Sequence, residues 1–203
     1  IKCNPQAKLI VCGCASQKTP SAFLKKGENV YAVTGAQRKN KVLEIVREGL
    51  RSECLQSADL QSEKYGVCLE EEKAYEEMPL PECLKTRNFV KIQDGCNRFC
   101  SYCVIPYLRG RSRSRDMESA AAEILQSEGW ETVVTGIDVS DYKDEKGRDL
   151  ADLMTAIRDA DTRIRLGSLE VSLITDRFLS ALKQVKRFAP QFHLSLQSGS
   201  DAV

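Results

Sequence analysis

The stretch Cys96-Asn97-Arg98-Phe99-Cys100-Ser101-Tyr102-Cys103 places three cysteines at C-x3-C-x2-C spacing. A loop of this length can bend three thiolates around one metal centre, and it leaves the fourth position without a protein ligand. Structural zinc sites are closed by four protein ligands, and two-cysteine redox motifs need only C-x-x-C. Three soft thiolates with a vacancy therefore favour an iron–sulfur cluster with one iron open to another ligand.

The wider string from Val90 to Arg115 (VKIQDGCNRFCSYCVIPYLRGRSRSR) resembles the radical S-adenosylmethionine (SAM) superfamily and, within it, the methylthiotransferases. The resemblance implies that Cys96, Cys100 and Cys103 hold a 4Fe-4S cluster whose fourth iron is chelated by the amino and carboxylate groups of SAM. It also implies that the aromatic ring of Tyr102 lies near the adenine of SAM.

The composition is that of an ordinary globular protein, with 42% hydrophobic and 29% charged residues among 203. No apolar run approaches the roughly 20 residues of a membrane span, and no signal-peptide pattern opens the chain. Nine cysteines without a secretion signal disfavour a disulfide scaffold and favour metal chemistry. We therefore expect a cytoplasmic protein that does not associate with membranes.

Positive charge is concentrated in one segment, although the net charge of the whole chain is only +1. Between Arg87 and Arg115 there are seven Lys and Arg residues and a single acid, Asp94. A basic segment of this kind can bind the phosphates of RNA. The alternatives are a solvated loop, or arginines that pair with carboxylates elsewhere in the fold.

Regular strand–helix alternation begins at residue 87. The predicted strands are 89–94, 131–136, 163–170 and 192–197, and the predicted helices between them are 116–127, 150–157 and 175–188. Repeats of this length predict parallel strands joined by right-handed crossovers, and hence an α/β barrel or partial barrel. With the resemblance, residues 87–203 are expected to form the first half of a radical SAM partial (βα) TIM-like barrel.

Residues 1–51 suggest a second, smaller α/β region. Apolar strand-like runs cover 7–14 and 30–35, and helical patterns cover 21–26 and 39–50. Residues 52–86 are polar and rich in acids and predict a linker. By resemblance, 1–51 is the C-terminal part of the methylthiotransferase N-terminal domain. Because the chain starts at Ile1 rather than methionine and stops just after a glycine-serine turn, we expect a fragment of a longer protein. By resemblance, the second half of the barrel, any C-terminal RNA-binding domain and two auxiliary-cluster ligands are missing from it, so we expect the fragment to be inactive alone.

Cys14 belongs to the string Val11-Cys12-Gly13-Cys14-Ala15-Ser16-Gln17, which resembles the third cysteine motif of the methylthiotransferase N-terminal domain, V-x-G-C-x-A-Q. The resemblance implies that Cys14 is a ligand of a second, auxiliary 4Fe-4S cluster, with two further ligands expected before Ile1. The alternative is that Cys12 and Cys14 are small buried hydrophobic residues in a strand. Cys3 does not match the family context, and three more cysteines are interpreted as incidental: Cys54, Cys68 and Cys83.

Polar residues follow the predicted strands at their carboxyl ends, where α/β barrels carry their active sites. The resemblance implies that Thr135, Gly136 and Asp138 lie near the SAM amino group, and that Glu170 and Gln197 lie near its polar edges. Each could instead form a turn or a helix cap. The only histidine, His193, is interpreted as a packing residue.

The same strand ends resemble the methylthiotransferase branch that modifies N6-threonylcarbamoyladenosine in tRNA. This resemblance implies a transferase in which the cluster reduces SAM to a 5'-deoxyadenosyl radical that abstracts hydrogen from C2 of the adenine beside the anticodon. Sulfur and a methyl group from a second SAM then complete the product. The implied partners are tRNA, SAM and an electron donor. The alternatives are a methylthiotransferase acting on isopentenyladenosine tRNA or on a ribosomal protein, and a non-catalytic zinc-binding RNA module.

Overall fold

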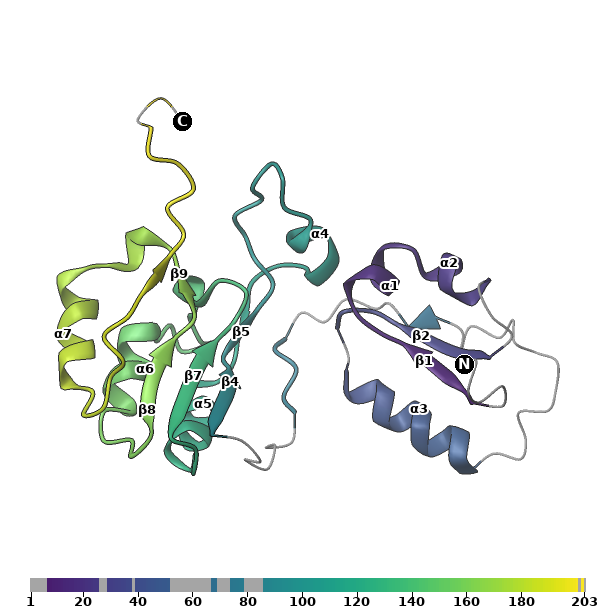
Figure 1. Cartoon of the computed structure of the whole chain (residues 1–203), viewed down its shortest axis with the longest axis horizontal. Coiled ribbons are helices and arrows are strands. Elements are labelled where there is room, and N and C mark those ends of the chain that lie inside the picture. Colours follow the sequence, from purple (N-terminus) through teal and green to yellow (C-terminus); the bar gives the residue numbers. More distant parts are fainter. Residues whose placement is uncertain are drawn as a thin grey trace. The chain divides into compact units, whose positions relative to one another are not determined.

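Two α/β units make up the described part of the chain, which a computed structural model covers at residues 7–25, 29–37, 39–51, 67–68, 74–78, 86–200 and 202. The first unit contains residues 1–72 and 102–110, and the second contains 73–101 and 111–203. Figure 1 gives the order of their elements. None of the helices in the described ranges has the length and apolar character needed to cross a membrane.

The first unit is built on a parallel sheet with the strand order β1-β2-β3. Its buried residues come mainly from the central strand, and they include Ala32 and Val33. The elements of this unit are β1 (Leu9–Val11), α1 (Cys14–Lys18), α2 (Pro20–Leu24), β2 (Val30–Thr34), α3 (Asn40–Arg51), β3 (Val67–Cys68) and α4 (Ile105–Arg109).

The first strand is shorter than predicted. It ends at Val11, and Cys14 is the first residue of α1 rather than a strand residue. Gly13 makes the turn with a φ of 117°, a conformation that residues with a side chain rarely adopt. The hydroxyl of Ser16 donates to the Thr34 carbonyl (2.7 Å) and thereby holds α1 on β2. In addition, β3 lies inside the segment predicted to be a linker.

The second unit contains a three-stranded parallel sheet with the order β4-β7-β8. Figure 1 shows this sheet with α5, α6 and α7 in the same unit. The elements are β4 (Arg87–Lys91), β5 (Gln93–Asp94), β6 (Arg113–Ser114), α5 (Met117–Leu125), β7 (Glu131–Thr135), η2 (Val139–Asp141), α6 (Leu150–Ala156), β8 (Arg163–Leu166), β9 (Ser168–Leu169), η3 (Val171–Leu173), α7 (Asp176–Gln184) and β10 (His193–Leu194).

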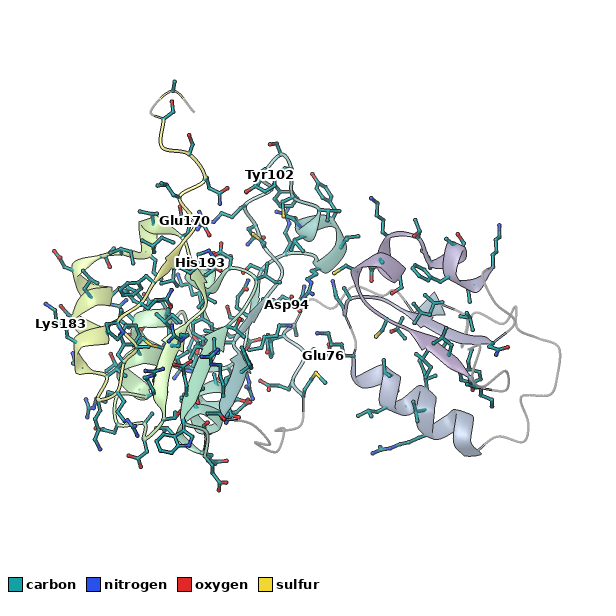
Figure 2. All side chains as sticks on the ribbon, viewed as in Figure 1. Glu76, Asp94, Tyr102, Glu170, Lys183 and His193 are labelled. Carbon is teal, nitrogen blue, oxygen red and sulfur yellow. The ribbon has the colours of Figure 1, made fainter. Side chains whose placement is uncertain are left out.

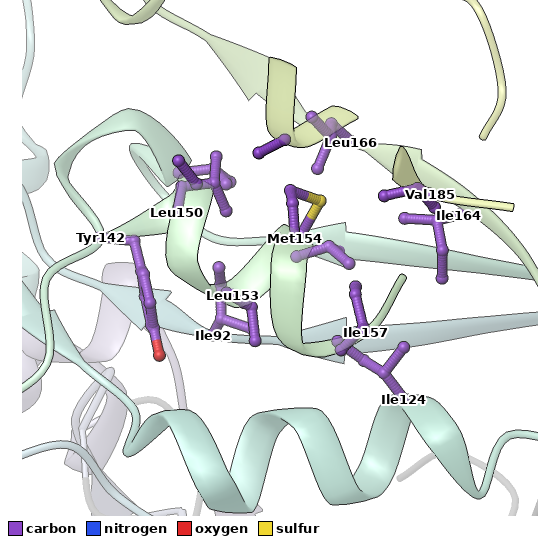
Figure 3. Close-up of a cluster of buried hydrophobic side chains, with 14 of the residues drawn as sticks. Ile92, Ile124, Tyr142, Leu150, Leu153, Met154, Ile157, Ile164, Leu166 and Val185 are labelled. Carbon is purple, nitrogen blue, oxygen red and sulfur yellow. The ribbon is translucent and has the colours of Figure 1, made fainter. Parts of the chain in front are cut away.

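Side-chain caps start the three long helices of this unit, close to the predicted helix starts at 116, 150 and 175. Asp116 accepts a hydrogen bond from the Ser119 amide, and Thr175 accepts one from the Phe178 amide. Asp149 and Asp152 form a reciprocal capping box at α6. The helices pack their apolar faces on the sheet, and Figure 3 shows the resulting core. Its fully buried members include Ile92, Ile124, Tyr142, Leu150, Leu153, Met154, Ile157 and Ile164.

The third and fourth predicted strands differ in detail from the structure. The third is divided at Gly167 into β8 and β9. The fourth region first runs beside β8, where Ile164 exchanges backbone hydrogen bonds with Arg187 and Ala189 (both 2.8 Å), and then forms β10 beside β9. The parallel order of the strands is therefore as predicted. However, α7 ends at Gln184, four residues before the predicted end of this helix at 188. This open parallel arrangement confirms the expected partial barrel.

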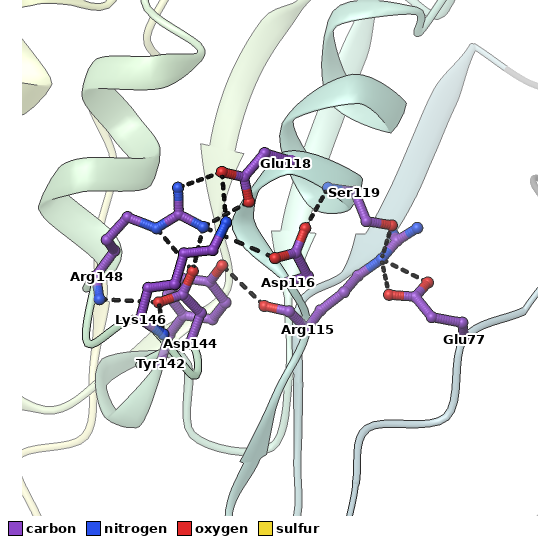
Figure 4. A network of polar contacts seen from close by, with 9 residues as sticks. All are labelled: Glu77, Arg115, Asp116, Glu118, Ser119, Tyr142, Asp144, Lys146 and Arg148. Carbon is purple, nitrogen blue, oxygen red and sulfur yellow. Dashed lines mark hydrogen bonds and ion pairs between the residues drawn. The ribbon is translucent and has the colours of Figure 1, made fainter.

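A polar network lies beside the start of α5 (Figure 4). The carboxylate oxygens of Asp116, Glu118 and Asp144 gather within 4.8 Å of one another. The guanidinium of Arg148 pairs with Glu118 and Asp144, each at 2.5 Å. Because a protein cation already neutralises them, these acids are interpreted as an ion-pair network.

Glu131 lies at the amino end of β7 between arginines on both neighbouring strands. The sheet register places it opposite Arg87 and Arg163. Its carboxylate is 2.7 Å from Arg87, 2.6 Å from Arg163 and 3.0 Å from Arg165, and its side chain is only 5% exposed. Hydrogen bonds from Arg165 and Arg163 lower the pKa of Glu131 from 4.5 to about 2.

We predict that Glu131→Gln removes an acid-sensitive part of the stability. The folded-state pKa is depressed, so the contribution is present above the unfolded value of 4.5 and is lost as the pH falls toward about 2. At neutral pH the variant should lose about 3–5 kcal/mol of unfolding free energy, because arginines are left without their counter-charge. Urea unfolding of both proteins between neutral pH and about pH 3 measures this difference.

The gap between the wild type and Glu131→Gln should narrow as the pH falls through this window. Glu145→Gln is the matched control, because Glu145 is exposed. A constant gap across the whole pH range would contradict the prediction.

Candidate functional site

The carboxyl ends of β4, β7 and the β8–β9 strand meet at one edge of the second unit, because parallel strands end on the same side. The segment that contains the first two cysteines follows β4 and β5. Gly136 and Asp138 follow β7, and Glu170 follows β9. We refer to this place as the carboxyl edge.

The loop of residues 95–112, here called the cysteine loop, leaves and re-enters the second unit through a short antiparallel ribbon. In this ribbon Gln93 pairs with Ser114, and Asp94 pairs with Arg113. The amide of Ser112 donates to the side-chain oxygen of Asn97 (3.3 Å). The base of the loop is therefore closed by backbone and side-chain contacts.

Gln93 joins the cysteine loop to the segment after β7. Its side chain is fully buried, and its amide nitrogen donates to the carbonyls of Asp94 (3.1 Å) and Gly95 (2.8 Å). Its amide oxygen accepts from the backbone N–H groups of Ile137 and Asp138, both at 2.9 Å. One amide thus satisfies backbone groups of two loops that are more than forty residues apart in the chain.

Gly136 makes this close approach possible. A Cβ added at Gly136 would lie 2.9 Å from the side-chain oxygen of Gln93 and 3.0 Å from its backbone oxygen. Real Cβ atoms do not approach that closely, so any side chain at 136 would push the two loops apart. Gly136 is therefore required by the contact with Gln93.

The cysteines of the loop differ in exposure. Cys96 is 9% exposed, whereas Cys100 and Cys103 are half-buried. The backbone N–H of Arg98 donates to the sulfur of Cys96 (3.4 Å). Such a hydrogen bond stabilises a thiolate, which is the form of cysteine that binds metals. Cys103 and Tyr102 fall in the first unit with α4, and Tyr102 is 76% exposed.

Arg98 brings two of the predicted site residues together. Its guanidinium lies 3.0 Å from Asp138 and 3.5 Å from Glu170. The hydrogen bond that Arg98 donates to the carboxylate of Asp138 raises the pKa of Arg98. The hydrogen bond from Ser172, with a further contribution from Arg98, lowers the pKa of Glu170. Two carboxylates of the carboxyl edge therefore face one cation.

Several arginines of the basic segment pair with carboxylates, as one of the alternatives expected. Arg115 is bound to Glu77 (2.9 Å) and to Glu123. Arg113 lies 3.7 Å from the buried Asp94, which also pairs with Lys91. The positive charges of these residues are therefore used in ion pairs that stabilise the fold.

The remaining predicted site residues include Gln197, Thr135 and Cys14. Gln197 is exposed and has a φ of 64° in the segment beyond β10. Thr135 is half-buried, and its carbonyl accepts from the Ile92 amide (2.9 Å). Cys14 is half-buried at the start of α1 in the first unit. His193 is exposed and hydrogen-bonds Ser168 (3.1 Å), so its interpretation as a packing residue was wrong (Figure 2).

The sequence reasoning missed Gln93 and Arg98. Both lie in the quoted string, and Arg98 is between the first two cysteines. Arg98 could have been found from the sequence, because it is a cation in a loop that was expected to lie beside the loops that carry Asp138 and Glu170. Gln93 had no signal of its own, because a glutamine at the end of a strand is usually solvated.

The three-cysteine loop follows β4 and β5 of a parallel α/β unit, which is the arrangement that the resemblance to radical SAM proteins predicts. The sequence of residues 90–203 matches the Radical SAM superfamily. The chain belongs to this superfamily, which confirms the family expected from the cysteine spacing. Membership implies a 4Fe-4S cluster and SAM as cofactors.

Within the superfamily, the chain is similar over its whole length to tRNA methylthiotransferases. It is 34% identical to the threonylcarbamoyladenosine tRNA methylthiotransferase MtaB of Aquifex aeolicus, with 98% of this chain and 48% of the relative covered. It is 32% identical to MtaB of Bacillus subtilis (100% and 45% covered). It is 30% identical to the tRNA-2-methylthio-N(6)-dimethylallyladenosine synthase of Clostridium perfringens (100% and 45%). The chain spans about half the length of these curated relatives.

We predict that Gln93→Ala lowers the free energy of unfolding by about 2–5 kcal/mol, because buried amide and carbonyl groups of both loops lose their partner. Urea unfolding at neutral pH measures the effect. Gln126→Ala, at an exposed glutamine, is the matched control and should change it by less than about 0.5 kcal/mol. Equal stability of Gln93→Ala and the control would contradict the proposed tie between the loops.

Proposed function

We propose that the protein is a radical SAM methylthiotransferase that adds a methylthio group to C2 of N6-threonylcarbamoyladenosine next to the anticodon of tRNA. The observation that carries the proposal is the cysteine loop, whose first residues, up to Ser101, follow β4 and β5 at the carboxyl edge of a parallel sheet. The proposed metal ligands are Cys96, Cys100 and Cys103.

The donor set suits a 4Fe-4S cluster. Three thiolates from one loop leave one iron open, and the N–H···S bond at Cys96 favours the charged sulfur. When bound, the reduced cluster supplies the electron that cleaves SAM, and the protein supplies orientation and the exclusion of water. Gln93 positions the cysteine loop against the loop of Gly136 and Asp138 for this task.

The carboxylates of the carboxyl edge suit the cationic groups of SAM, its sulfonium and its ammonium. Asp138 and Glu170 face the guanidinium of Arg98, so this edge favours positive charge. We assign these two carboxylates to SAM binding, with Thr135 and Gly136 beside them. Tyr102 and Gln197 are assigned to SAM by resemblance alone.

The choice of tRNA substrate rests on the strand ends. Thr135-Gly136-Ile137 and Ser168-Leu169-Glu170 resemble the threonylcarbamoyladenosine branch. Relatives with names from that branch and from the dimethylallyladenosine branch both match the chain. The comparisons therefore support a tRNA methylthiotransferase, and the choice of threonylcarbamoyladenosine as the modified nucleoside rests on the strand ends alone.

The remaining assignments stay predictions. They are an auxiliary cluster that uses Cys14, an electron donor as a partner, a cytoplasmic location, and the division into a methylthiotransferase domain (1–51), a linker (52–86) and a radical SAM core (87–203). The placement of Cys14 at the start of α1, half-buried rather than enclosed, is compatible with a ligand role.

We expect about four irons per chain after anaerobic purification, in addition to any iron on an auxiliary site. Electron paramagnetic resonance (EPR) of the dithionite-reduced protein should show a signal that SAM perturbs, because SAM binds the open iron. The triple variant Cys96→Ala, Cys100→Ala, Cys103→Ala should lose this signal. Stoichiometric zinc without iron would overturn the proposal in favour of a zinc-binding RNA module.

The substrate is tested by mass spectrometry of tRNA nucleosides. The complete gene that encodes this chain is expressed in a strain that lacks its own tRNA methylthiotransferases, and the 203-residue chain alone, which we expect to be inactive, is expressed as a control. We expect the methylthio group on threonylcarbamoyladenosine and none on isopentenyladenosine. In a second strain that also lacks threonylcarbamoylation, the product should disappear. Methylthiolated isopentenyladenosine in either strain would contradict the assigned substrate.

A further inference from the structure

The amino ends of β4, β7 and β8 form a second edge of the sheet, opposite to the carboxyl edge. A cavity of about 460 Å3 lies at this amino edge, and it is lined by Thr86, Arg87, Trp130, Glu131, Arg163 and Arg187. Its volume lies within the roughly 300–1,000 Å3 range that pockets for small ligand groups span. None of these residues belongs to the site proposed for the cluster and SAM.

The cavity carries excess positive charge. Three of its lining residues are arginines, and the only acid among them is Glu131. That carboxylate is already shared between Arg87, Arg163 and Arg165. Arg87 and Arg163 remain 52% exposed despite the ion pairs, so their guanidinium groups can still contact a ligand.

Arg187 adds a third arginine to the cavity. It is exposed, and its guanidinium donates to the Asp161 carbonyl. Within the described ranges no carboxylate forms an ion pair with Arg187. An arginine with free donors beside two half-exposed arginines is suited to bind phosphate oxygens.

Trp130 provides a flat apolar surface next to these cations. It directly precedes Glu131 and is 76% exposed, although large aromatic residues in a folded domain are usually buried. Exposed aromatic rings beside a basic groove are typical of sites that stack nucleic-acid bases and hold the backbone by charge. An acidic polypeptide could pair with the arginines, but it has no bases to stack on the ring of Trp130.

We propose that the amino edge is a second RNA-binding site, in which Trp130 stacks on an unpaired base and Arg163 and Arg187 bind the adjoining phosphates. The proposal rests on the proposed function for its partner, the substrate tRNA. It assigns to this RNA a contact at the opposite end of the sheet from the cysteine loop.

Trp130 also reports on the site, because it is the only tryptophan of the 203-residue chain. We expect a single-stranded oligoribonucleotide of about eight nucleotides to quench its fluorescence in a saturable manner. Arg187→Gln should weaken the binding about tenfold and reduce the dependence of log K on log salt by about one unit. Arg177→Gln is the matched control, since Arg177 is 57% exposed at the start of α7, away from the cavity.

Stacking is tested with a labelled oligoribonucleotide and fluorescence anisotropy. Trp130→Ala should weaken binding about tenfold, and Trp130→Phe, which keeps an aromatic ring, should recover most of the affinity. Arg187→Gln breaks no ion pair of the described fold, so its loss of binding does not reflect unfolding. Circular dichroism of each variant verifies this.

Three results would each overturn the proposal. They are an unchanged Trp130 emission with RNA at low salt, equal weakening by Arg187→Gln and Arg177→Gln, and equal competition by polyglutamate or by inorganic phosphate. Binding of the oligoribonucleotide is measured without a cluster or SAM. The RNA-binding proposal can therefore be contradicted while the EPR signal of the reduced protein is intact. Conversely, absence of iron would affect the proposed function without changing the Trp130 titration.

Discussion

The buried amide of Gln93 is the contact on which the geometry of the carboxyl edge depends. A single side chain donates to the Gly95 carbonyl of the cysteine loop and accepts from two N–H groups of the segment after β7. Each of these backbone groups would cost free energy if it were buried without a partner, so the two loops are held in one relative position. The contact also requires Gly136, since only a residue without a side chain fits against Gln93.

Arginine–carboxylate pairs organise both edges of the sheet, but in different ways. At the carboxyl edge, Arg98 lies between Asp138 and Glu170, so acids exceed cations and the edge favours a positively charged ligand. At the amino edge, Glu131 lies among several arginines, and the excess is positive. One sheet thus offers two surfaces of opposite electrostatic preference, separated by the length of its strands.

The fold of the second unit was largely predictable from local patterns. Helix caps at Asp116, Asp149 and Thr175 are short-range signals, because each side chain bonds an amide within three residues. Parallel strand order follows from regular strand–helix repeats. The ends of elements were less predictable. The strand before Cys14 stops at Val11 because Gly13 turns the chain, and the third strand breaks at Gly167.

By itself, the sequence determined the class of chemistry and the family, since three closely spaced cysteines and their flanking string are local properties of the chain. It also indicated that Asp138 and Glu170 follow strands that end on the same side of the sheet. Only the tertiary structure showed that Arg98 lies between these two carboxylates and that Gln93 joins the two loops. Such contacts link residues forty or more positions apart, and their partners are set by how the strands align rather than by any neighbouring residue. The same holds for the amino edge, where strand register gathers arginines from separate strands around Glu131 beside the exposed Trp130.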